Sequence, residues 1–593
     1  MSRQRQTDKR QKELIRHLLE SDSDVSSLES DSDVDARDVE PSSESDSIGT
    51  DDDDDDDQST SQVGVTGNAP FDVSSLQWND DPTVAPTIPP FTGNTGLLFD
   101  PADMQPIDFF MQYVDMDLIC HMVYQTNLYA RQFFRDNGGA LGAQSRCRQW
   151  KETNTEEMKR FIGLTLLMGV VRKPKIASYW STDFTMNTQV FPGVMKRNRY
   201  QLMLRFWHLN DNDRCPPPDS PNTDRLYKIR PVVDHLFEKF QTTYAVGHEV
   251  SVDESLLLWK GRLSFKQYLP LKRSRFGIKL YKLCESETGY VYRFFVYVGK
   301  LSSPITCPPS HAPPPDFGAT ETIVWYLTMP LFDAGHCLYV DNFYTSLPLF
   351  RALYARRTLA CGTIRSNRKG YPKSLIQHKL SLVGQSTALR AKELLALKFR
   401  DKKEVYMLTT AHNSACTTVT VHRKDMQTMD KPDCILNYNR KMGGVDRSDQ
   451  LIQPYDCTRK SKIWYKKLCL HLLQLALLNA HIVYKQSSAE AKLSFLDFSN
   501  EVIAELLKAS TDDDESELDT VPHENVLRLT GRHYPMKIPL GPQQTKVMKR
   551  CKVCHKKKIR RESRYTCDQC PSKPGLCVDT CFRLYHSKRK YWK

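Results

Sequence analysis

Four aspartates stand where carboxylates from distant segments of the chain can meet. Asp253 lies within EVSVDESLLLW, whose Val and Leu content is typical of a strand, and Asp341 ends the short apolar strand expected over HCLYVD. The carboxyl ends of strands are where α/β sheets place their sites. Asp446 and Asp449 are one turn apart on the helix expected after the glycines of KMGGVDRSDQ, so both can face one point.

Carboxylates gathered in this way repel one another unless cations neutralise them. Two magnesium ions held by such groups can activate an attacking oxygen and stabilise a leaving oxygen in phosphodiester chemistry. Taken singly, each aspartate is more typical of a helix cap or a turn. The complete set, in this strand order, favours a magnesium site.

A second group of chemistry-bearing residues lies near the C-terminus, where a short segment without a sizeable core needs metal to fold. Two Cys-x-x-Cys pairs and further ligands there have zinc spacing. The seven candidate ligands are Cys551, Cys554, Cys567, Cys570, Cys577, Cys581 and His586. Two zinc ions need eight ligands; His555 is the leading candidate for the eighth, with Asp579 or a water as alternatives. Which pair binds which ion stays open.

The elements that must position the aspartates change in type along the chain. Helical signals dominate residues 106–247, including a capping box at Thr153–Glu156 followed by apolar residues at helical spacing. From Glu249, three strands (EVSVDESLLLW, FGIKLYKLCES, GYVYRFFVYVG) precede a helix around 321–332 and the strands HCLYVD and RTLACGTIR. A three-strand meander, a helix and a strand are the opening order of the ribonuclease-H-like α/β fold.

Charge is distributed unevenly over the 593 residues, whose net charge is +12. Residues 20–57 hold 18 acids and one Arg, and we expect the first 100 or so residues to be disordered. The remainder is strongly basic, which favours a polyanionic partner, most plausibly nucleic acid, although basic excess also aids solubility.

Membrane insertion and secretion are not expected. No apolar run reaches the about 18 residues that a membrane span needs, and the N-terminus lacks an apolar signal segment. We therefore expect an intracellular, soluble protein.

At the aspartates and beyond, the chain resembles the piggyBac family of transposases. The segments SVDESLLLWKGR, YVDNFYTS, GTIRSNRKG, NYNRKMGGVDRSDQ and CKVCHKKKIRRESRYTCDQC look like family motifs, and they occur in family order from about residue 105 to the C-terminus. The resemblance implies that Asp253, Asp341 and Asp446 form a catalytic triad that binds two Mg²⁺ ions, or Mn²⁺, with Asp449 as an accompanying fourth acid.

The resemblance also implies the reaction and the partners. A homodimer in the nucleus would act on double-stranded DNA at the terminal inverted repeats of a transposon. Each end would be nicked, closed into a hairpin over a TTAA overhang, reopened and joined to a TTAA target.

The resemblance further implies a ribonuclease-H-like catalytic core split by an insertion, a helical dimerisation and DNA-binding domain drawn from both sides of it, and a two-zinc cross-brace module, similar to RING and PHD fingers, that binds the transposon end. The expected boundaries are 1–104 for a disordered acidic region, 105–248 for the first helical part, 249–365 for the first part of the core, 366–432 for the insertion domain, 433–456 for the second part of the core, 457–530 for the second helical part and 546–593 for the zinc module.

Basic and aromatic residues near the carboxylates fit a DNA substrate. Lys and Arg would hold phosphates, and an aromatic ring could stack on an unpaired base. The candidates are Lys260, Arg262, Lys272, Arg273, Arg275, Lys279, Arg365, Arg368 and Lys369 for phosphates, and Tyr344 and Trp464 for bases. For Trp464, packing in the helical core is slightly favoured over base stacking. Residues 546–593 hold 16 Lys or Arg against three acids, which favours DNA over a ubiquitin-pathway partner, and MKRCKVCHKKKIRR is compatible with nuclear import.

Three functions are compatible with these features. The leading hypothesis is an active transposase. The alternative is a domesticated, transposase-derived protein that binds DNA or chromatin without cutting. A more distant one is a zinc-module protein that reads histone tails or recruits ubiquitin enzymes.

Overall fold

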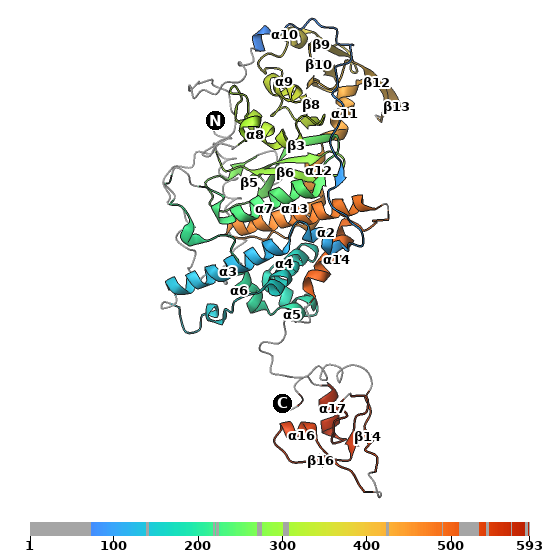
Figure 1. Cartoon of the computed structure of the whole chain (residues 1–593). Coiled ribbons are helices and arrows are strands. Elements are labelled where there is room, and N and C mark those ends of the chain that lie inside the picture. Colours follow the sequence, from blue (N-terminus) through green and yellow to red (C-terminus); the bar gives the residue numbers. More distant parts are fainter. Residues whose placement is uncertain are drawn as a thin grey trace, which may run out of the picture. The chain divides into compact units, whose positions relative to one another are not determined.

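The computed structural model describes most of the chain from Val73 onward (Figure 1). The described residues are 73–137, 141–217, 220, 224–269, 275–299, 307–422, 426–488, 490–508, 533–540, 545–570, 572–587 and 591. They belong to two compact units, Met1–Lys508 and Ala509–Lys593.

A nine-stranded mixed sheet is the centre of the first unit. An antiparallel meander of β3, β5 and β6 is followed by helix α8, strand β7, helix α9 and strand β8, and β7 and β8 run parallel to β3. The bounds are β3 Glu249–Leu258, β5 Phe276–Glu285, β6 Val291–Val296, α8 Ala319–Thr328, β7 Cys337–Val340, α9 Leu347–Ala355 and β8 Leu359–Thr363. The expected element order and the α/β fold class are confirmed.

The segment 366–432, expected as an insertion domain, continues the same sheet. Its strands β9 (Ser386–Ala391), β10 (Leu394–Arg400) and β11 (Glu404–Thr409) add to the free edge of β8 in the order β8-β11-β10-β9, all antiparallel. Only β12 (Cys416–His422) and β13 (Met426–Pro432) pair apart from it, as a two-stranded hairpin. The insertion covers the edge of β8, which would otherwise expose unpaired backbone groups.

Helices from both ends of the first unit pack together below the sheet in Figure 1. α4 (Thr155–Val170) lies against α14 (Phe495–Leu507), and α2 (Pro106–Met111) packs on α13 (Trp464–Ser487), so segments expected to form one helical domain are in contact. The cap of α4 is one residue later than predicted, because the Asn154 side chain accepts the backbone N–H of Glu157. The remaining helices named here are α3 Met116–Asn137, α6 Arg197–Phe206 and α7 Arg230–Thr243.

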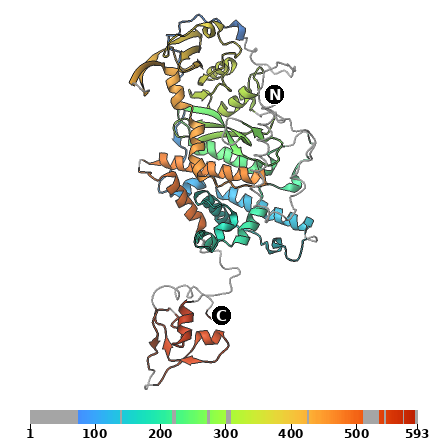
Figure 2. The same cartoon turned by 180° about the vertical axis from the view of Figure 1, so that it is seen from behind.

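Helix α13 lies between the sheet and the helices α2–α4, as both views show (Figures 1 and 2). Among the described residues it alone is long and apolar enough to cross a membrane, but 89% of its most apolar window is buried inside the structure, as in the core helix of a soluble protein. Its polar Asn479 is also buried: the amide donates to the carbonyl of Val291 and accepts that residue's N–H, both at 2.9 Å. Asn479 thereby pairs with edge strand β6.

The expected N-terminal boundary of order, residue 104, is too late. Val73, Leu76 and Trp78 pack against the apolar core, the Asp80 carboxylate accepts the N–H of Lys392 at 2.6 Å, and Tyr354 donates to the carbonyl of Thr87 at 2.9 Å. Residues 73–97, called the arm below, therefore pack against the first unit's core and its sheet. The sequence before Val73 has low hydrophobicity. A prediction from composition therefore does not detect the few apolar contacts made by residues 73–97. The acidic residues 20–57 lie outside the described residues.

The second unit is small and built from short elements. β14 (Met536–Lys537) pairs with β17 (Tyr565–Thr566), β15 (Lys549–Arg550) pairs with β16 (Glu562–Ser563), and the helices are α16 (Lys552–Lys556) and α17 (Thr580–Ser587). Its apolar core has few members besides cysteines. The small apolar area buried in this core contributes little to the free energy of folding. This agrees with the expectation that the second unit needs metal to fold.

His208 follows α6 and links it to α13. It is 1% exposed; its Nδ1 lies 3.0 Å from the Tyr465 hydroxyl, and its Nε2 lies 2.9 Å from Oδ1 of Asn212. The neutral ring protonated on Nε2 satisfies both partners, since Nδ1 then accepts from the hydroxyl. Burial, with the nearby Lys466 ammonium, lowers the pKa of His208 to about 3.

The helical region should therefore lose stability in acid. The unfolded chain takes up a proton at His208 below pH ~6.5 while the folded chain does not, so the free energy of unfolding should fall by up to about 1.4 kcal/mol per pH unit from this residue as the pH drops toward 4. The lowered pKa values of His336, His412, His471 and His481, each caused mainly by desolvation, act in the same direction. Urea unfolding between pH 7.5 and 4.5 gives the pH dependence of the free energy of unfolding for wild type and for His208→Gln. The difference between the two slopes is the contribution of His208, and equal slopes would contradict the prediction.

Truncation should separate the arm from the acidic region. Removing residues 1–72 should leave the melting temperature unchanged and strengthen DNA binding at low salt, where the 18 acids of residues 20–57 are least screened. Removing residues 1–97 should lower the melting temperature by several degrees, because the contacts of the arm are lost. Calorimetry and fluorescence anisotropy of the two variants check this; a lower melting temperature already in the shorter deletion would contradict it.

Candidate functional site

Asp253 and Asp341 follow equivalent positions on two paired parallel strands. Val252 pairs with Val340 at the end of the β3–β7 ladder, so each aspartate is the next residue along its strand. Neighbouring strands lie about 4.8 Å apart. The register therefore places the two acids side by side where β7 ends and β3 continues.

Asp341 is half-buried and lies near a further acid, Glu254. One carboxylate oxygen of Asp341 accepts the N–H of Phe343 at 2.9 Å. Burial, together with the Glu254 carboxylate, raises the pKa of Asp341. A buried carboxylate next to another one favours a cation as neighbour. Sequence reasoning missed Glu254, although it directly follows Asp253.

Helix α12 (Gly444–Ile452) carries the other two acids and lies against β3. At its start, a Cβ on Gly444 would come within 2.5 Å of the Ser251 hydroxyl, so only glycine allows this approach. One and a half turns later, the Ser255 hydroxyl donates to Oδ1 of Asp449 at 2.9 Å. Ser251 and Ser255 flank Asp253 on one face of the strand, because side chains alternate. The helix thus crosses Asp253, and the exposed Asp446 lies between its two contacts.

Asp449 has a buried cationic partner that the sequence did not reveal. The Lys282 ammonium lies 2.7 Å from Oδ1 of Asp449, and the Lys282 side chain is 0% exposed. Although burial alone would raise it, this ammonium and its hydrogen bond hold the pKa of Asp449 below its ordinary value. Lys282 is also the cross-strand partner of Asp253. The sequence signal that could have indicated it is a lysine within the otherwise apolar strand segment LYKLC.

The four aspartates surround one region without converging tightly. Among the described residues, only two sets of Cys and His bring three or more ligand atoms within 4.8 Å of one another. The carboxylates of Asp253, Asp341 and Asp446 do not meet that distance. Their backbone positions on β3, after β7 and on α12 are nevertheless neighbours, since β3 pairs with β7 and packs against α12. Carboxylate oxygens are the donors that Mg²⁺ prefers.

Most of the predicted phosphate contacts stand exposed in loops near the aspartates. One group lies in the chain between β3 and β5, and the other follows β8. Both groups are therefore near the end of the sheet at which Asp341 follows β7. The exposed members are Lys260, Arg262, Arg275, Arg365 and Lys369. The other two residues of the first group, Lys272 and Arg273, lie outside the described residues.

Three further candidates, Lys279, Arg368 and Tyr344, are placed differently from the prediction. Lys279 is only 6% exposed, with its ammonium over the rings of Tyr281 and Phe343, so it does not present a charge to DNA. Arg368 donates to the carbonyls of Asn342 and Phe343 and so supports the loop after Asp341.

The two aromatic candidates are packed. Tyr344 is 1% exposed and donates to the Glu254 carboxylate at 2.8 Å, so the prediction that it stacks on a base is wrong: its ring has no free face. Trp464 is half-buried, edge-on to Phe265 at 5.4 Å, which agrees with the helix-packing interpretation.

The second unit holds two compact ligand sets. Cys551, Cys554, Cys577 and Cys581 form one, and His533, Cys567, Cys570 and His586 form the other; in each, all ligand atoms lie within 4.8 Å of one another. The two sets alternate along the chain, which is a cross-brace. Four thiolates, or two thiolates and two imidazoles, are the donors of tetrahedral structural zinc.

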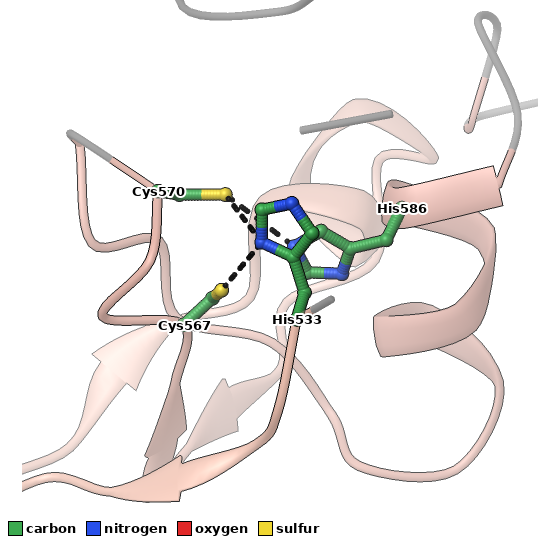
Figure 3. Close-up of side chains that lie close together, drawn as sticks. All are labelled: His533, Cys567, Cys570 and His586. Carbon is green, nitrogen blue, oxygen red and sulfur yellow. Dashed lines mark hydrogen bonds between the residues drawn. The ribbon is translucent and has the colours of Figure 1, made fainter. Parts of the chain in front are cut away.

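The mixed set corrects the predicted eighth ligand. Figure 3 shows the His533 ring beside His586 and facing Cys567 and Cys570. Nδ1 of His533 lies 3.2 Å from Sγ of Cys567, whereas His555 is exposed and belongs to neither set. His533 lies 18 residues before the first cysteine of the cluster, so the expected start of the module at residue 546 is too late.

Comparison with known proteins agrees with this architecture. Residues 105–481 match a family model described as transposase IS4. The chain is 27% identical over 424 residues to human PiggyBac transposable element-derived protein 3 and 24% identical over 430 residues to human PiggyBac transposable element-derived protein 2. The chain belongs to the piggyBac family of transposases. These alignments cover 68% and 69% of the chain but only 65% and 66% of the relatives, so the chain spans about two thirds of their length.

The fold and the zinc unit have matches of their own. A solved piggyBac transposase synaptic complex with hairpin DNA superposes with a TM-score of 0.60 at 22% identity, covering 82% of this chain and 98% of that one. Residues 533–587 match a model described as a DDE_Tnp_1-like zinc finger, which begins at His533. This piggyBac-family chain therefore has the family fold and a zinc-finger unit.

His533 and His555 offer a matched test of the ligand assignment. The full-length chain should contain two zinc ions, and His533→Ala should lose close to one of them, because its set keeps only three protein ligands. His555→Ala, an equal change at an exposed histidine outside both sets, should retain two. Metal analysis after dialysis measures both; zinc loss from His555→Ala but not from His533→Ala would restore the original assignment.

Proposed function

We propose that this piggyBac-family protein is an active DNA transposase that excises and integrates DNA at TTAA sites by a cut-and-paste reaction. The observation that carries the proposal is the arrangement of the acids. Asp253 on β3 and Asp341 after β7 follow paired positions, and α12, which carries Asp446, packs against β3. All four acids of the family pattern are present.

The proposed chemistry follows from these carboxylates. Asp253, Asp341 and Asp446 would hold two Mg²⁺ ions, and the bound ions would activate the attacking oxygen and stabilise the leaving one. Water then nicks each transposon end, and the freed 3′-hydroxyl attacks the opposite strand to form a hairpin over TTAA. The hairpin is reopened, and the 3′ ends join a TTAA target. Every step exchanges one oxygen for another at phosphorus, so a single site suffices.

DNA contact is proposed for the exposed basic loops beside the acids. Lys260, Arg262 and Arg275 on one side, with Arg365 and Lys369 on the other, would hold the phosphates of the strand being cut. Such contacts give affinity that falls with salt but little discrimination among bases. The solved relative that shares this fold was captured with hairpin DNA.

Recognition of the transposon end is proposed for the zinc unit. Its zinc ions would be structural, and its surplus of Lys and Arg suits a DNA backbone. We also propose that the protein works in the nucleus as a homodimer, as its family resemblance implies.

A domesticated, DNA-binding role without cutting is the alternative. Two observations favour it. Human relatives are named PiggyBac transposable element-derived proteins, and a further human relative is named a chimeric ERCC6-PGBD3 protein. An excision assay with a marker flanked by the cognate ends separates the two functions.

Replacing one acid at a time tests the proposed reaction. Asp253→Asn, Asp341→Asn and Asp446→Asn should each lower nicking and joining by more than roughly 100-fold, the upper range for residues that only support a metal ligand. Folding and end binding should persist, since the side-chain volume hardly changes. Asp449→Asn should also impair the reaction.

A matched control is Asp234→Asn, at a side chain that is 63% exposed on α7. It should excise at the wild-type rate. Wild-type excision by any one of the triad variants would remove that residue from the triad, and an inactive wild type with its cognate ends would favour the alternative function.

A further inference from the structure

Three elements of the site meet at a single oxygen atom. Oδ1 of Asp449 on α12 accepts hydrogen bonds from the Ser255 hydroxyl on β3 and from the Lys282 ammonium on β5. Ser255, Lys282 and Asp449 are called the clamp below. Within the part of the chain that the structure describes, Oδ2 of Asp449 receives no hydrogen bond.

The clamp joins α12 to the strand that carries Asp253. Lys282 pairs with Asp253 across the β3–β5 ladder, and cross-strand partners share a face of the sheet. At the other end of the contact, Gly444 lies so close to Ser251 that the helix cannot move nearer. A close backbone contact at one end and an ion pair at the other thus fix α12 in both position and rotation.

Charge makes the clamp hard to open. Lys282 has no exposed surface, and removing the carboxylate would leave a buried ammonium without its counter-charge. Breaking such a pair costs far more than breaking an exposed one. Asp446 lies one turn before Asp449 on the same helix, so its position depends on where the clamp holds that helix.

We propose that Lys282 is a positioning residue: through Asp449 it holds α12, and with it Asp446, over Asp253. The expected effect of Lys282 on DNA nicking rests on the proposed function. Its expected effect on the position of α12 does not.

A second buried lysine shows what a purely structural pair looks like. Lys398 on β10 is 2% exposed, donates to the carbonyls of Ile376 and His378, and pairs with Glu404 at 3.1 Å. It has the same chemistry and burial in the same sheet but joins only parts of the insertion. Lys398→Met is therefore the matched control for Lys282→Met.

The experiment compares these variants in the full-length, zinc-loaded chain. Hydrogen exchange of the amides of residues 444–452, measured without added metal, should be faster by roughly tenfold or more in Lys282→Met, as expected when a hydrogen bond to a charged group is lost. Mn²⁺ affinity, measured by electron paramagnetic resonance with Asp253→Asn as blank, should fall about 10- to 100-fold. Lys282→Arg should recover part of both, and Lys398→Met should change neither.

Two further variants keep the test decisive. If Lys282→Met does not fold, the double variant Lys282→Met/Asp449→Asn removes both charges together and should fold, with the same faster exchange in α12. Ser255→Ala should give a smaller effect of the same kind. Wild-type exchange of α12 and wild-type Mn²⁺ affinity in the folded Lys282 variants, with only a lower melting temperature, would overturn the proposal.

Failure of the proposed function is distinguishable from failure of the clamp. If the wild type nicks no DNA, the proposed function fails, while exchange and Mn²⁺ binding still decide the role of Lys282. If the wild type nicks DNA, Lys282→Met should need more Mg²⁺ for half-maximal nicking, with end binding in EDTA unchanged.

Discussion

The parallel register of β3 and β7 is the constraint on which the site depends. It sets Val252 opposite Val340 and therefore makes Asp253 and Asp341 neighbours, although 87 residues and a helix separate them in the chain. α12, the loop after Asp341 and the basic loops beyond β3 and β8 are all arranged around that pair. A slip of one residue would move one acid to the opposite face of the sheet.

Acids gathered in one region repel one another, and neighbouring groups in this structure offset part of that repulsion. The buried Lys282 ammonium pairs with Asp449, and the Tyr344 hydroxyl and the backbone N–H of Phe343 donate to the carboxylates of Glu254 and Asp341. These groups hold the acids in place without neutralising all of them. The remaining negative charge is what a divalent cation would balance.

The strand pattern predicted the core well, because β-branched and aromatic alternation is local information. The order of β3, β5, β6, α8 and β7, and the positions of Asp253 and Asp341 within it, follow from that pattern alone. Burial of Tyr344 and Lys279 depends on contacts between distant segments, which no local pattern carries. The same holds for His533, which stands apart from the cysteines it joins, and for the arm, whose few apolar anchors follow a long polar stretch.

The Ser255–Asp449 hydrogen bond joins residues that are 194 positions apart. During synthesis, β3 and its acid therefore leave the ribosome long before α12 and α13 exist to cover them. Until then, the face of the sheet that ends up against these helices is open to chaperones and to other chains. A shortened product that ends before residue 444 would keep two of the aspartates and much of the basic surface, yet it would lack the segment that completes the site.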